Sequence, residues 1–454
     1  MKRPSLSTTA LVLLSINAVL NIRGLPLFSH IGLQALGFYF LAILGFLIPS
    51  GFVCAELAAR VPTSGGVYAW VRAAFGERLG FLAIWFEWIN NVIAFPATLS
   101  TIAATILFLI FPNTEQHRFL FYGLMMLVLW SLTALNLCGV KASSRLSSWT
   151  AFWGTLIPGG LVIVLGLIWA SLGRPIGFLH PASSIFPSLS FSNLSLFVAA
   201  MGALSGLQIT AFHLKETENP EKTFPRVMGI SCGLIIFLSL GAILAMSAVV
   251  PPRALNLLSG VMQMYQLFFS SLGLTAILPI FALLLSLGMI GSMSAWMLGP
   301  ARGLHVAAMG GHLPACFAKL NSVGIPKNIL LTQALISTLF ATVFIFMPSL
   351  KAAFWMLIAL TSQFTVMTYL LIFASVIRLQ FRDRKRLKNF CIPGGKFGVW
   401  SLAGLGLLAT ATAFVLGVFP PSQLELHVSG KFIGEMLMMD GLIIGFPYLI
   451  KRLV

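Results

Sequence analysis

Charged residues are scarce in this sequence. Only 9% of its 454 residues are Asp, Glu, Lys or Arg, whereas 58% are hydrophobic, and the mean hydropathy is +0.97. A soluble domain of this length would need far more polar surface. A membrane-spanning helix takes roughly 20 apolar residues, and the chain offers about a dozen such runs separated by short polar loops. We therefore predict an all-α polytopic membrane protein with about 12 transmembrane helices.

Acidic residues are the scarcer charge: there are 11 Asp and Glu against 28 Lys and Arg, a net charge of +17. When the loops alternate between the two sides and the N-terminus starts inside, 22 of the 28 basic residues fall on the inner side. Arg23 falls inside a span, and five fall in outer loops, namely Arg118, Arg174, Arg253, Lys351 and Lys431. This asymmetry follows the positive-inside rule. It indicates cytoplasmic termini and a lipid bilayer partner, and it excludes a nucleic-acid partner as the reason for the basicity.

Cysteine is also rare, and enzyme motifs are missing. The five cysteines are scattered, with no metal or redox spacing, so we expect free thiols: Cys54, Cys138, Cys232, Cys316 and Cys391. The sequence contains no Walker loop, nucleotide fingerprint, His-Glu metal helix or nucleophile elbow. We expect no cofactor, no metal and no enzymatic activity. The N-terminal apolar run lacks a signal-peptide cleavage site, so it is interpreted as the first span.

Two apolar runs are interrupted by small and polar residues. One interruption reads Asn21-Ile22-Arg23-Gly24-Leu25-Pro26 in the first run, and the other reads Ser205-Gly206-Leu207-Gln208 in the sixth. Broken backbone at membrane depth survives only where protein or a water-filled cavity satisfies it. The half-helix ends then offer free N–H and C=O groups to a charged solute. Gly206 could instead serve only close helix packing.

The positions of the two interruptions predict a five-plus-five inverted repeat, because they lie five spans apart. We assign residues 1–175 to the first repeat (helices 1–5), residues 190–380 to the second (helices 6–10), and residues 398–454 to helices 11 and 12. The eighth helix is expected to end near residue 298, followed by a long inner loop.

Several motifs occur in a fixed order along nearly the whole chain. They are Ile48-Pro49, Cys54-Ala55-Glu56-Leu57-Ala58, Gly65-Gly66-Val67, Ala69-Trp70-Val71, Gly80-Phe81, Glu216 with Asn219-Pro220, Trp296, Gly299-Pro300, Arg302-Gly303, Leu313-Pro314-Ala315, Phe317-Ala318-Lys319 and Ile392-Pro393-Gly394-Gly395-Lys396. Together they resemble the amino acid–polyamine–organocation superfamily, and more closely its glutamate:γ-aminobutyrate antiporter branch. The resemblance implies a leucine-transporter-like fold and a bacterial inner-membrane location.

The chain departs from that branch in three places. Gln208 stands where the branch has a glutamate, and the helix-one break lacks the tyrosine and glutamate of the branch. The chain ends at Val454, just past the expected twelfth helix, without the plugging tail of the best-known member. Gln208 points to altered selectivity, and plug-type acid gating is not expected.

The resemblance implies that the unwound backbones of helices one and six hold the substrate's α-carboxylate and α-amine. The backbone candidates are Gly24, Leu25, Ser205, Gly206 and Leu207. Gln208 offers both a donor and an acceptor to a substrate side chain. Its alternative role is an ordinary hydrogen bond between helices.

Two charged residues lie at membrane depth. Arg23 is costly there, so it is expected to face a cavity, an acidic substrate or Glu87, although a structural or snorkelling role is equally open. Glu87 is the one acid deep in the third helix; it could carry a proton or pair with Arg23. His213 is a second proton-coupling candidate, with a satisfied interfacial histidine as the favoured alternative. Trp296 is a weak candidate for the substrate site.

The sequence thus predicts a secondary transporter that moves amino acids or their amines by exchange or proton-coupled symport. Within transport, a glutamate:γ-aminobutyrate exchanger competes with a broader neutral amino acid permease. A transport-inactive receptor and a membrane-embedded enzyme are the alternatives from other classes. A channel is disfavoured, because no charge ring or filter repeat is present.

Overall fold

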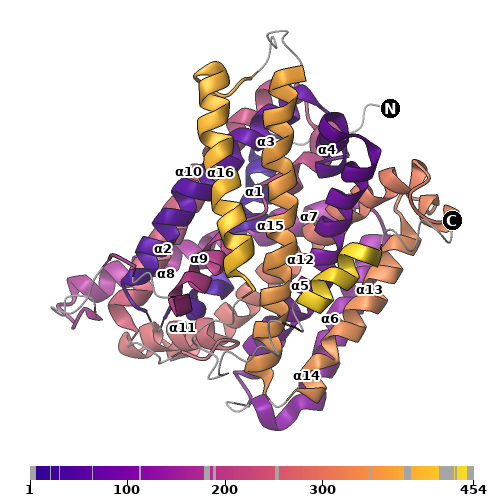
Figure 1. Ribbon diagram of the computed structural model, residues 1–454. Helices are drawn as coiled ribbons and strands as arrows, with labels where there is room; N and C mark the ends of the chain where they lie inside the picture. Colours follow the sequence, from indigo (N-terminus) through magenta and orange to yellow (C-terminus); the bar gives the residue numbers. More distant parts are fainter. Residues whose placement is uncertain are drawn as a thin grey trace.

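The chain folds into a bundle of long helices, seen in the computed structural model in Figure 1. The structure describes residues 7–20, 22–29, 31–63, 65–111, 114–177, 185–187, 191–250, 255–347, 349–382, 390–418, 434 and 437–446. Within these residues every regular element is a helix, and 11 helical segments are long and apolar enough to cross a membrane. The all-α polytopic prediction is therefore confirmed. The expected twelfth span is described only over Leu437–Phe446, a shorter apolar helix that we call the last helix.

Each of the 11 spans consists of one to three helical elements. In chain order they are α1 (Thr8–Val19) with η1 (Ile22–Phe28), α2 (Gln34–Ala42) with η2 (Ile43–Leu47) and α3 (Ile48–Arg60), α5 (Glu77–Leu107), α6 (Arg118–Leu137), α7 (Val140–Thr150) with η4 (Ala151–Leu156) and α8 (Ile157–Ser171), α9 (Phe191–Ala203) with η6 (Leu207–Glu216), α10 (Pro220–Val249), η7 (Thr275–Ile277) with α12 (Leu278–Met309), α13 (Lys327–Ala341) with α14 (Val343–Phe346), α15 (Leu350–Arg382) and α16 (Gly395–Leu416). Outside these spans the described residues also form α4 (Val67–Phe75) and α11 (Gly260–Ser271), which are too short to span, and the 3-10 helices η3 (Thr114–His117) and η8 (Ala315–Ala318).

Two boundaries differ from the sequence prediction. The expected end of the eighth helix near residue 298 is wrong, because α12 continues through Pro300 to Met309. The loop that follows is correspondingly shorter. Helix α11, which lies between α10 and α12, was not predicted at all. Its 12 residues are too few for a span, and a search for long apolar runs does not detect such a helix.

Small residues bring the helices into close contact. A Cβ atom added to Gly154 of η4 would lie 2.3 Å from the backbone nitrogen of Gly288 in α12, and one added to Gly291 would meet Thr150. Helices in lipid associate through such close packing, because no hydrophobic driving force brings them together there. The packing holds α12 firmly against the α7–η4–α8 span.

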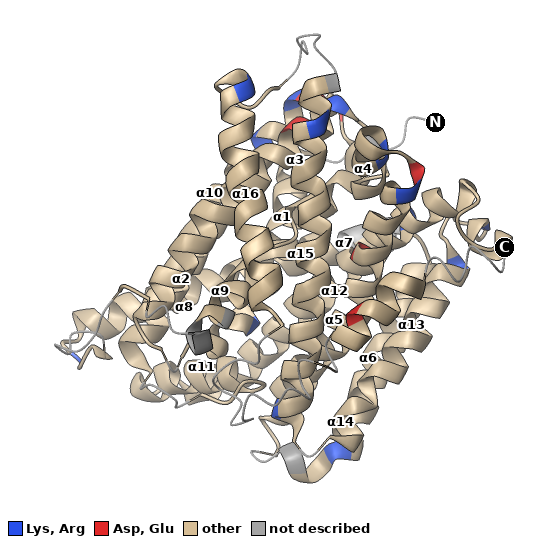
Figure 2. Cartoon of the chain, in the orientation of Figure 1, with Lys and Arg blue, Asp and Glu red and all other residues tan. Residues whose placement is uncertain are grey.

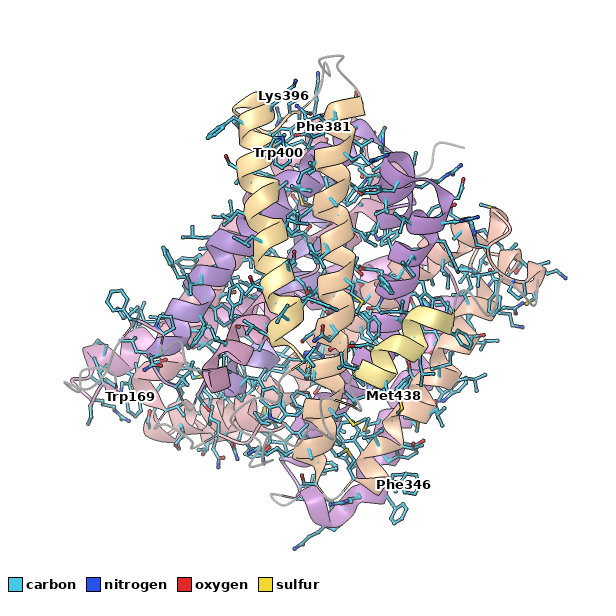
Figure 3. All side chains as sticks on the ribbon, in the orientation of Figure 1. Trp169, Phe346, Phe381, Lys396, Trp400 and Met438 are labelled. Atoms are coloured by element: carbon cyan, nitrogen blue, oxygen red, sulfur yellow. The ribbon has the colours of Figure 1, made fainter. Side chains whose placement is uncertain are left out.

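Basic side chains gather at one end of the bundle (Figure 2). We call this the basic end; α4, the C-terminal ends of α3 and α15, and the start of α16 meet there. Figure 3 shows Lys396 and Phe381 at this end and Phe346 at the opposite end. The completely buried carboxylate of Glu56 accepts hydrogen bonds from Arg60 Nη2 at 2.6 Å and from the backbone N–H of Ile392 at 2.8 Å. This contact ties α3 to the segment that leads into α16.

Candidate functional site

The first span is broken beside Leu20. Helix α1 ends at Val19, Leu20 is extended (φ −66°, ψ 108°), and the chain resumes as the 3-10 helix η1, which contains Pro26. Proline removes a backbone donor and cannot continue an α-helix without strain. The predicted interruption of the first helix is confirmed. Asn21, its first predicted residue, lies outside the described residues.

The second break lies between α9, which ends at Ala203, and η6, which begins at Leu207. Gly206 has φ +129°, a conformation that L side chains rarely adopt. A Cβ atom added there would lie 2.9 Å from both the carbonyl oxygen of Ala18 and Cζ2 of Trp296. Gly206 thus serves both the turn and the close approach of the two broken spans.

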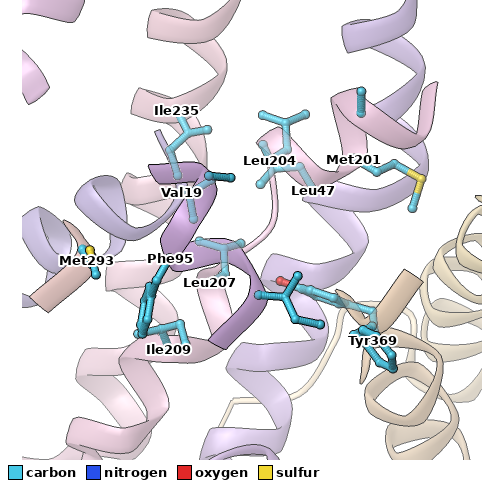
Figure 4. Close-up of a cluster of buried hydrophobic side chains, with 14 of the residues drawn as sticks. Val19, Leu47, Phe95, Met201, Leu204, Leu207, Ile209, Ile235, Met293 and Tyr369 are labelled. Carbon is cyan, nitrogen blue, oxygen red and sulfur yellow. The ribbon is translucent and has the colours of Figure 1, made fainter. Parts of the chain in front are cut away.

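Hydrogen bonds join the two breaks to each other and to their neighbours. Trp296 Nε1 of α12 donates to the carbonyl oxygen of Ala18 at 3.1 Å, one residue before the end of α1. The hydroxyls of Ser15 and Thr210 are 2.9 Å apart, which links α1 to η6. Figure 4 shows Val19 and Leu207 in this region, with the hydroxyl of Tyr369 pointing toward the segment that carries Leu207.

A chain of buried polar groups supports the second break. The backbone N–H of Gly206 donates to the Tyr369 hydroxyl at 3.1 Å, and this hydroxyl donates to Oε1 of Gln208. Nε2 of Gln208 in turn donates to Oε1 of Glu87 at 2.8 Å. Tyr369, Gln208 and Glu87 are each at most 1% exposed. The network fixes η6 to α5 and α15 and satisfies both sides of the Gln208 amide.

A cavity of about 170 Å³ lies beside the two breaks. Its walls come from the second half of α5, the first halves of α12 and α15, the end of α9, and the segment around the α1–η1 break. The cavity is therefore displaced from the basic end. Since one water needs about 10–15 Å³ of such space, the cavity has room for on the order of ten waters or a small organic solute.

Arg23 is the one charged side chain among the described residues that line this cavity. It projects from η1, and its Nη1 donates to the hydroxyl of Thr98 on α5, which itself donates to the carbonyl oxygen of Ala94 at 3.1 Å. A guanidinium is a strong donor to carboxylates. The cavity consequently has a positive side, next to the first break.

Three asparagines also line the cavity, and two of them hydrogen-bond to other residues of the protein. Asn17 accepts from the Thr155 hydroxyl at 2.8 Å, and Asn91 Nδ2 donates to the Trp296 carbonyl at 3.1 Å. Asn90, in contrast, is 7% exposed, and its Oδ1 has no hydrogen-bond partner among the described residues. A buried acceptor of this kind suits an ammonium or hydroxyl group of a solute.

Side chains pack closely between the second break and the basic end. The Phe212 ring of η6, 1% exposed, lies where a Cβ atom on Gly66, Gly299 or Gly303 would approach it to 2.5–3.1 Å. Closer to the surface, Glu77 accepts from the Tyr68 hydroxyl at 2.7 Å and pairs with Arg72 at 2.6 Å. Burial and the hydrogen bond to Glu77 raise the pKa of Tyr68 to about 12, so the hydroxyl remains a donor.

The predicted site residues separate into two groups. Arg23, Gly24, Ser205 and Trp296 line the cavity. Leu25, Gly206, Leu207, Gln208, Glu87 and His213 are not among its lining residues; Gln208 and Glu87 bond to each other instead, as described above. The hydrogen bond between helices that was the alternative for Gln208 is thus present, and its contact with substrate stays a prediction.

Sequence reasoning missed Thr98, Tyr369 and the role of Asn90. Each is an isolated polar residue within an apolar run, which gives no local signal of its partner. Only the presence of Asn90 beside Asn91 and Glu87 in the third span could have indicated that this part of α5 faces a polar space. The contacts of Arg23 and Glu87 described here are with Thr98 and Gln208, respectively.

Two discontinuous spans around a polar cavity define a class of protein, the multi-pass membrane permeases that bind a solute at broken helices. A model of the amino acid permease family matches residues 6–439 of this chain, and the chain belongs to that family. An uncharacterized transporter of Legionella pneumophila is 38% identical over 440 residues, which cover 97% of this chain and 94% of that protein.

Two relatives with more specific names are more distant. The glutamate/gamma-aminobutyrate antiporter of Lactococcus lactis is 26% identical over 463 residues, which cover 100% of this chain and 91% of that protein. The probable agmatine/putrescine antiporter of the same species is 24% identical, with 81% of this chain and 78% of that protein covered. The predicted superfamily, and the closer resemblance to the glutamate:γ-aminobutyrate antiporter branch, are therefore confirmed.

Proposed function

We propose that this protein is a secondary transporter of amino acids or their decarboxylated amines, working by exchange or proton-coupled symport, and that glutamate and γ-aminobutyrate are its first candidate pair. The single observation that carries the proposal is the cavity between the two helix breaks, in which Arg23 is the one charged side chain among the described lining residues. Both solutes carry a carboxylate and an ammonium group and are small enough for such a space.

In the proposed binding mode the two ends of the substrate meet different groups. A carboxylate lies toward the guanidinium of Arg23, near the first break. The ammonium group lies toward Oδ1 of Asn90, an acceptor without a partner among the described residues, and toward carbonyls freed at the breaks. Asn90 and Thr98 are two turns of α5 apart, about 12 Å, and the arginine side chain shortens the gap that the solute must bridge.

We infer the membrane orientation from the charge distribution. The basic end is taken as cytoplasmic by the positive-inside rule, and cytoplasmic termini in a bacterial inner membrane remain part of the proposal. The cavity, displaced from that end, is then nearer the outside, and Phe212 with its glycine neighbours closes the cytoplasmic side. Transport requires this packing to open while the outer side closes.

The five-plus-five repeat remains part of the proposal, with residues 1–175 and 190–380 as its halves and residues 398–454 outside it. Helices one, two, six and seven, which here are the α1, α3, η6 and α10 spans, would rock against the others. The break residues Gly24, Leu25, Ser205, Gly206 and Leu207 offer backbone groups to the substrate in this scheme. Gln208 supports the second break through its hydrogen bonds to Glu87 and Tyr369. Glu87 and His213 stay candidates for proton coupling.

Counterflow in proteoliposomes tests the proposal. Vesicles are preloaded with single amino acids, γ-aminobutyrate or agmatine, and entry of labelled glutamate is followed at acidic and neutral pH. Accumulation with a particular preload identifies an exchanger and its solute pair. No entry with any preload rejects the glutamate assignment, and a screen of other labelled amino acids on the same vesicles then tests the wider class.

A broader neutral amino acid permease is the second candidate. Gln208 stands where the antiporter branch has a glutamate, and hydroxyl and amide groups supply most of the polar lining of the cavity. Competition of labelled alanine or serine uptake by glutamate separates the two candidates. Ligand-dependent thermal stabilisation without uptake would indicate a transport-inactive receptor.

A further inference from the structure

Three buried polar side chains on the far side of α5 have no hydrogen-bond partner among the described residues. They are Asp440 of the last helix, Gln333 of α13 and Trp88 of α5, which are 5%, 0% and 3% exposed. The unpaired atoms are both carboxylate oxygens of Asp440, both amide heteroatoms of Gln333 and Nε1 of Trp88. Buried polar groups are nearly always satisfied, so a concentration of such atoms calls for an explanation.

The helix register brings Gln333 level with Trp88. Ser337 Oγ of α13 donates to the carbonyl oxygen of Val92 on α5 at 2.9 Å. Both helices start on the side of the basic end and run away from it (Figure 1). One turn back along each helix from this hydrogen bond lie Gln333 and Trp88.

Asp440 lies at the same level along α5 as Trp88 and Gln333. Trp85 Nε1 donates to the carbonyl oxygen of Ile443 at 3.1 Å, and the Trp85 ring stacks on Phe446 with centroids 5.7 Å apart. Figure 3 shows Met438 at the end of the last helix that points away from the basic end, so the last helix runs opposite to α5. One turn forward from Trp85 is Trp88, and one turn back from Ile443 is Asp440.

These three residues lie apart from the substrate cavity. None of them is among the cavity-lining residues. Trp88 follows Glu87 directly, and successive side chains on a helix diverge by about 100°. Glu87 bonds to Gln208 near the second break, whereas the Trp88 ring lies beside that of Trp85, with centroids 5.4 Å apart, on the face that α13 and the last helix contact. One helix, α5, thus separates two polar regions.

Charge compensation for Asp440 is missing from the described surroundings. On α5 the charged residues are Glu77, Arg78 and Glu87, and on α13 the charged residue is Lys327. Glu77 pairs with Arg72 and Glu87 with Gln208, while Arg78 and Lys327 are exposed at the helix ends nearer the basic end. An ionised carboxylate buried without a cation is strongly disfavoured.

The hydrogen-bonding capacities of the three groups match when Asp440 is protonated. A carboxylic acid offers one donor and one acceptor oxygen, and the Gln333 amide offers the complementary acceptor and donor. Trp88 adds one donor, for which the carboxyl group has a further lone pair. An ionised Asp440 would supply no donor to Oε1 of Gln333. Because none of these atoms lies within hydrogen-bond distance of another, protonation satisfies all three groups through bridging water.

We propose that Asp440, Gln333 and Trp88 form a second polar site, separate from the substrate cavity, whose ligand is a proton held on Asp440 at neutral pH. The site lies between α5, α13 and the last helix. Because α5 also carries Glu87 and Asn90, loss of the proton would act on the helix that lines the substrate cavity. The assignment of the proton does not depend on which solute the protein transports.

Infrared difference spectroscopy of the full-length protein in lipid tests this site without any transport assay. Protonated carboxyl groups give a C=O stretching band that ionised ones lack. We expect such a band at neutral pH in the wild type, its loss in Asp440→Asn, and its retention in Glu87→Gln, the matched variant at the other buried acid of α5. In Gln333→Leu and Trp88→Phe the Asp440 band should remain and shift in frequency, because its hydrogen bonds change.

Two outcomes overturn the proposal. If the neutral-pH carboxyl band is the same in Asp440→Asn and wild type, Asp440 is ionised there. If the band disappears in Asp440→Asn but Gln333→Leu and Trp88→Phe leave its frequency unchanged, Asp440 carries the proton but does not form a site with Gln333 and Trp88. Size-exclusion chromatography of each variant distinguishes a lost proton from a misfolded protein. Counterflow on the same preparations reports separately on the proposed transport.

Discussion

Gln208 and Glu87 are joined side chain to side chain, with Nε2 of Gln208 donating to Oε1 of Glu87 at 2.8 Å in a completely buried setting. The amide also accepts from Tyr369, so it connects the acid on α5 to the break in the sixth span. A glutamate at position 208 could keep hydrogen bonds with both neighbours only if one of the two acids were protonated.

The first prediction follows from this pair. Gln208→Glu places two carboxyl groups within hydrogen-bond distance, and two carboxyl groups that close together are not both ionised. We expect uptake to fall at neutral pH and to recover as the pH is lowered, because a proton shared by the pair restores the hydrogen bond. Gln208→Leu removes both hydrogen bonds and should lose uptake at every pH. Uptake measured over a pH series checks both variants, and a Gln208→Glu profile parallel to wild type would contradict the argument.

The second prediction concerns the charge in the cavity. Arg23→Ala removes the one cationic donor of the described lining, and a hydrogen bond to a charged group contributes about 1.5–3 kcal/mol. That corresponds to a rise in KM for an acidic substrate of roughly 10- to 100-fold. Arg23→Lys should retain part of the affinity, and Thr98→Val, which removes only the hydroxyl that Arg23 contacts, should change KM less. Equal KM values for Arg23→Ala and wild type would show that Arg23 is structural.

The third prediction tests the turn at the second break. Gly206→Ala puts a Cβ atom 2.9 Å from Ala18 O and Trp296 Cζ2 at φ +129°, so it should lower the free energy of unfolding by about 1–3 kcal/mol. We also expect loss of transport, because the two broken spans must separate at this point. The matched control is Gly233→Ala on α10, where a Cβ atom meets open space. Thermal unfolding in detergent and uptake in vesicles measure the two effects; a neutral Gly206→Ala would show that the break tolerates a side chain.

Hydropathy alone was sufficient to predict most of the fold. Long apolar runs cannot avoid the membrane, and glycine grouped with proline or polar residues within such a run marks a candidate break. The spans and both breaks follow from these local facts. The extension of α12 does not, because Gly299-Pro300 resembles a helix end, whereas the surrounding helices pack around it and accommodate the proline.

The candidate site was only half predictable for a different reason. Arg23 and Gly206 are conspicuous in an apolar sequence, so each could be selected from its own segment. Tyr369 lies 161 residues from Gln208 along the chain, and its role comes entirely from tertiary packing. The hydrogen bond between Gln208 and Glu87 likewise depends on how η6 packs against α5, which the sequence around either residue does not reveal.

The last prediction concerns closure at the basic end. Phe212 fills a space left by the missing side chains of Gly66, Gly299 and Gly303, and a Cβ atom on Gly303 would lie 2.7 Å from its ring. Gly303→Ala should displace the ring and open a path from the cytoplasm to the cavity. We would place one cysteine at Ser205, in the cavity wall, after replacing the five native cysteines. A membrane-impermeant thiol reagent should label it from outside only in the parent, and from both sides in Gly303→Ala, with Gly233→Ala as control. Labelling from the cytoplasmic side in the parent would contradict the closed state, and unchanged labelling in Gly303→Ala would show that Phe212 does not seal the cavity.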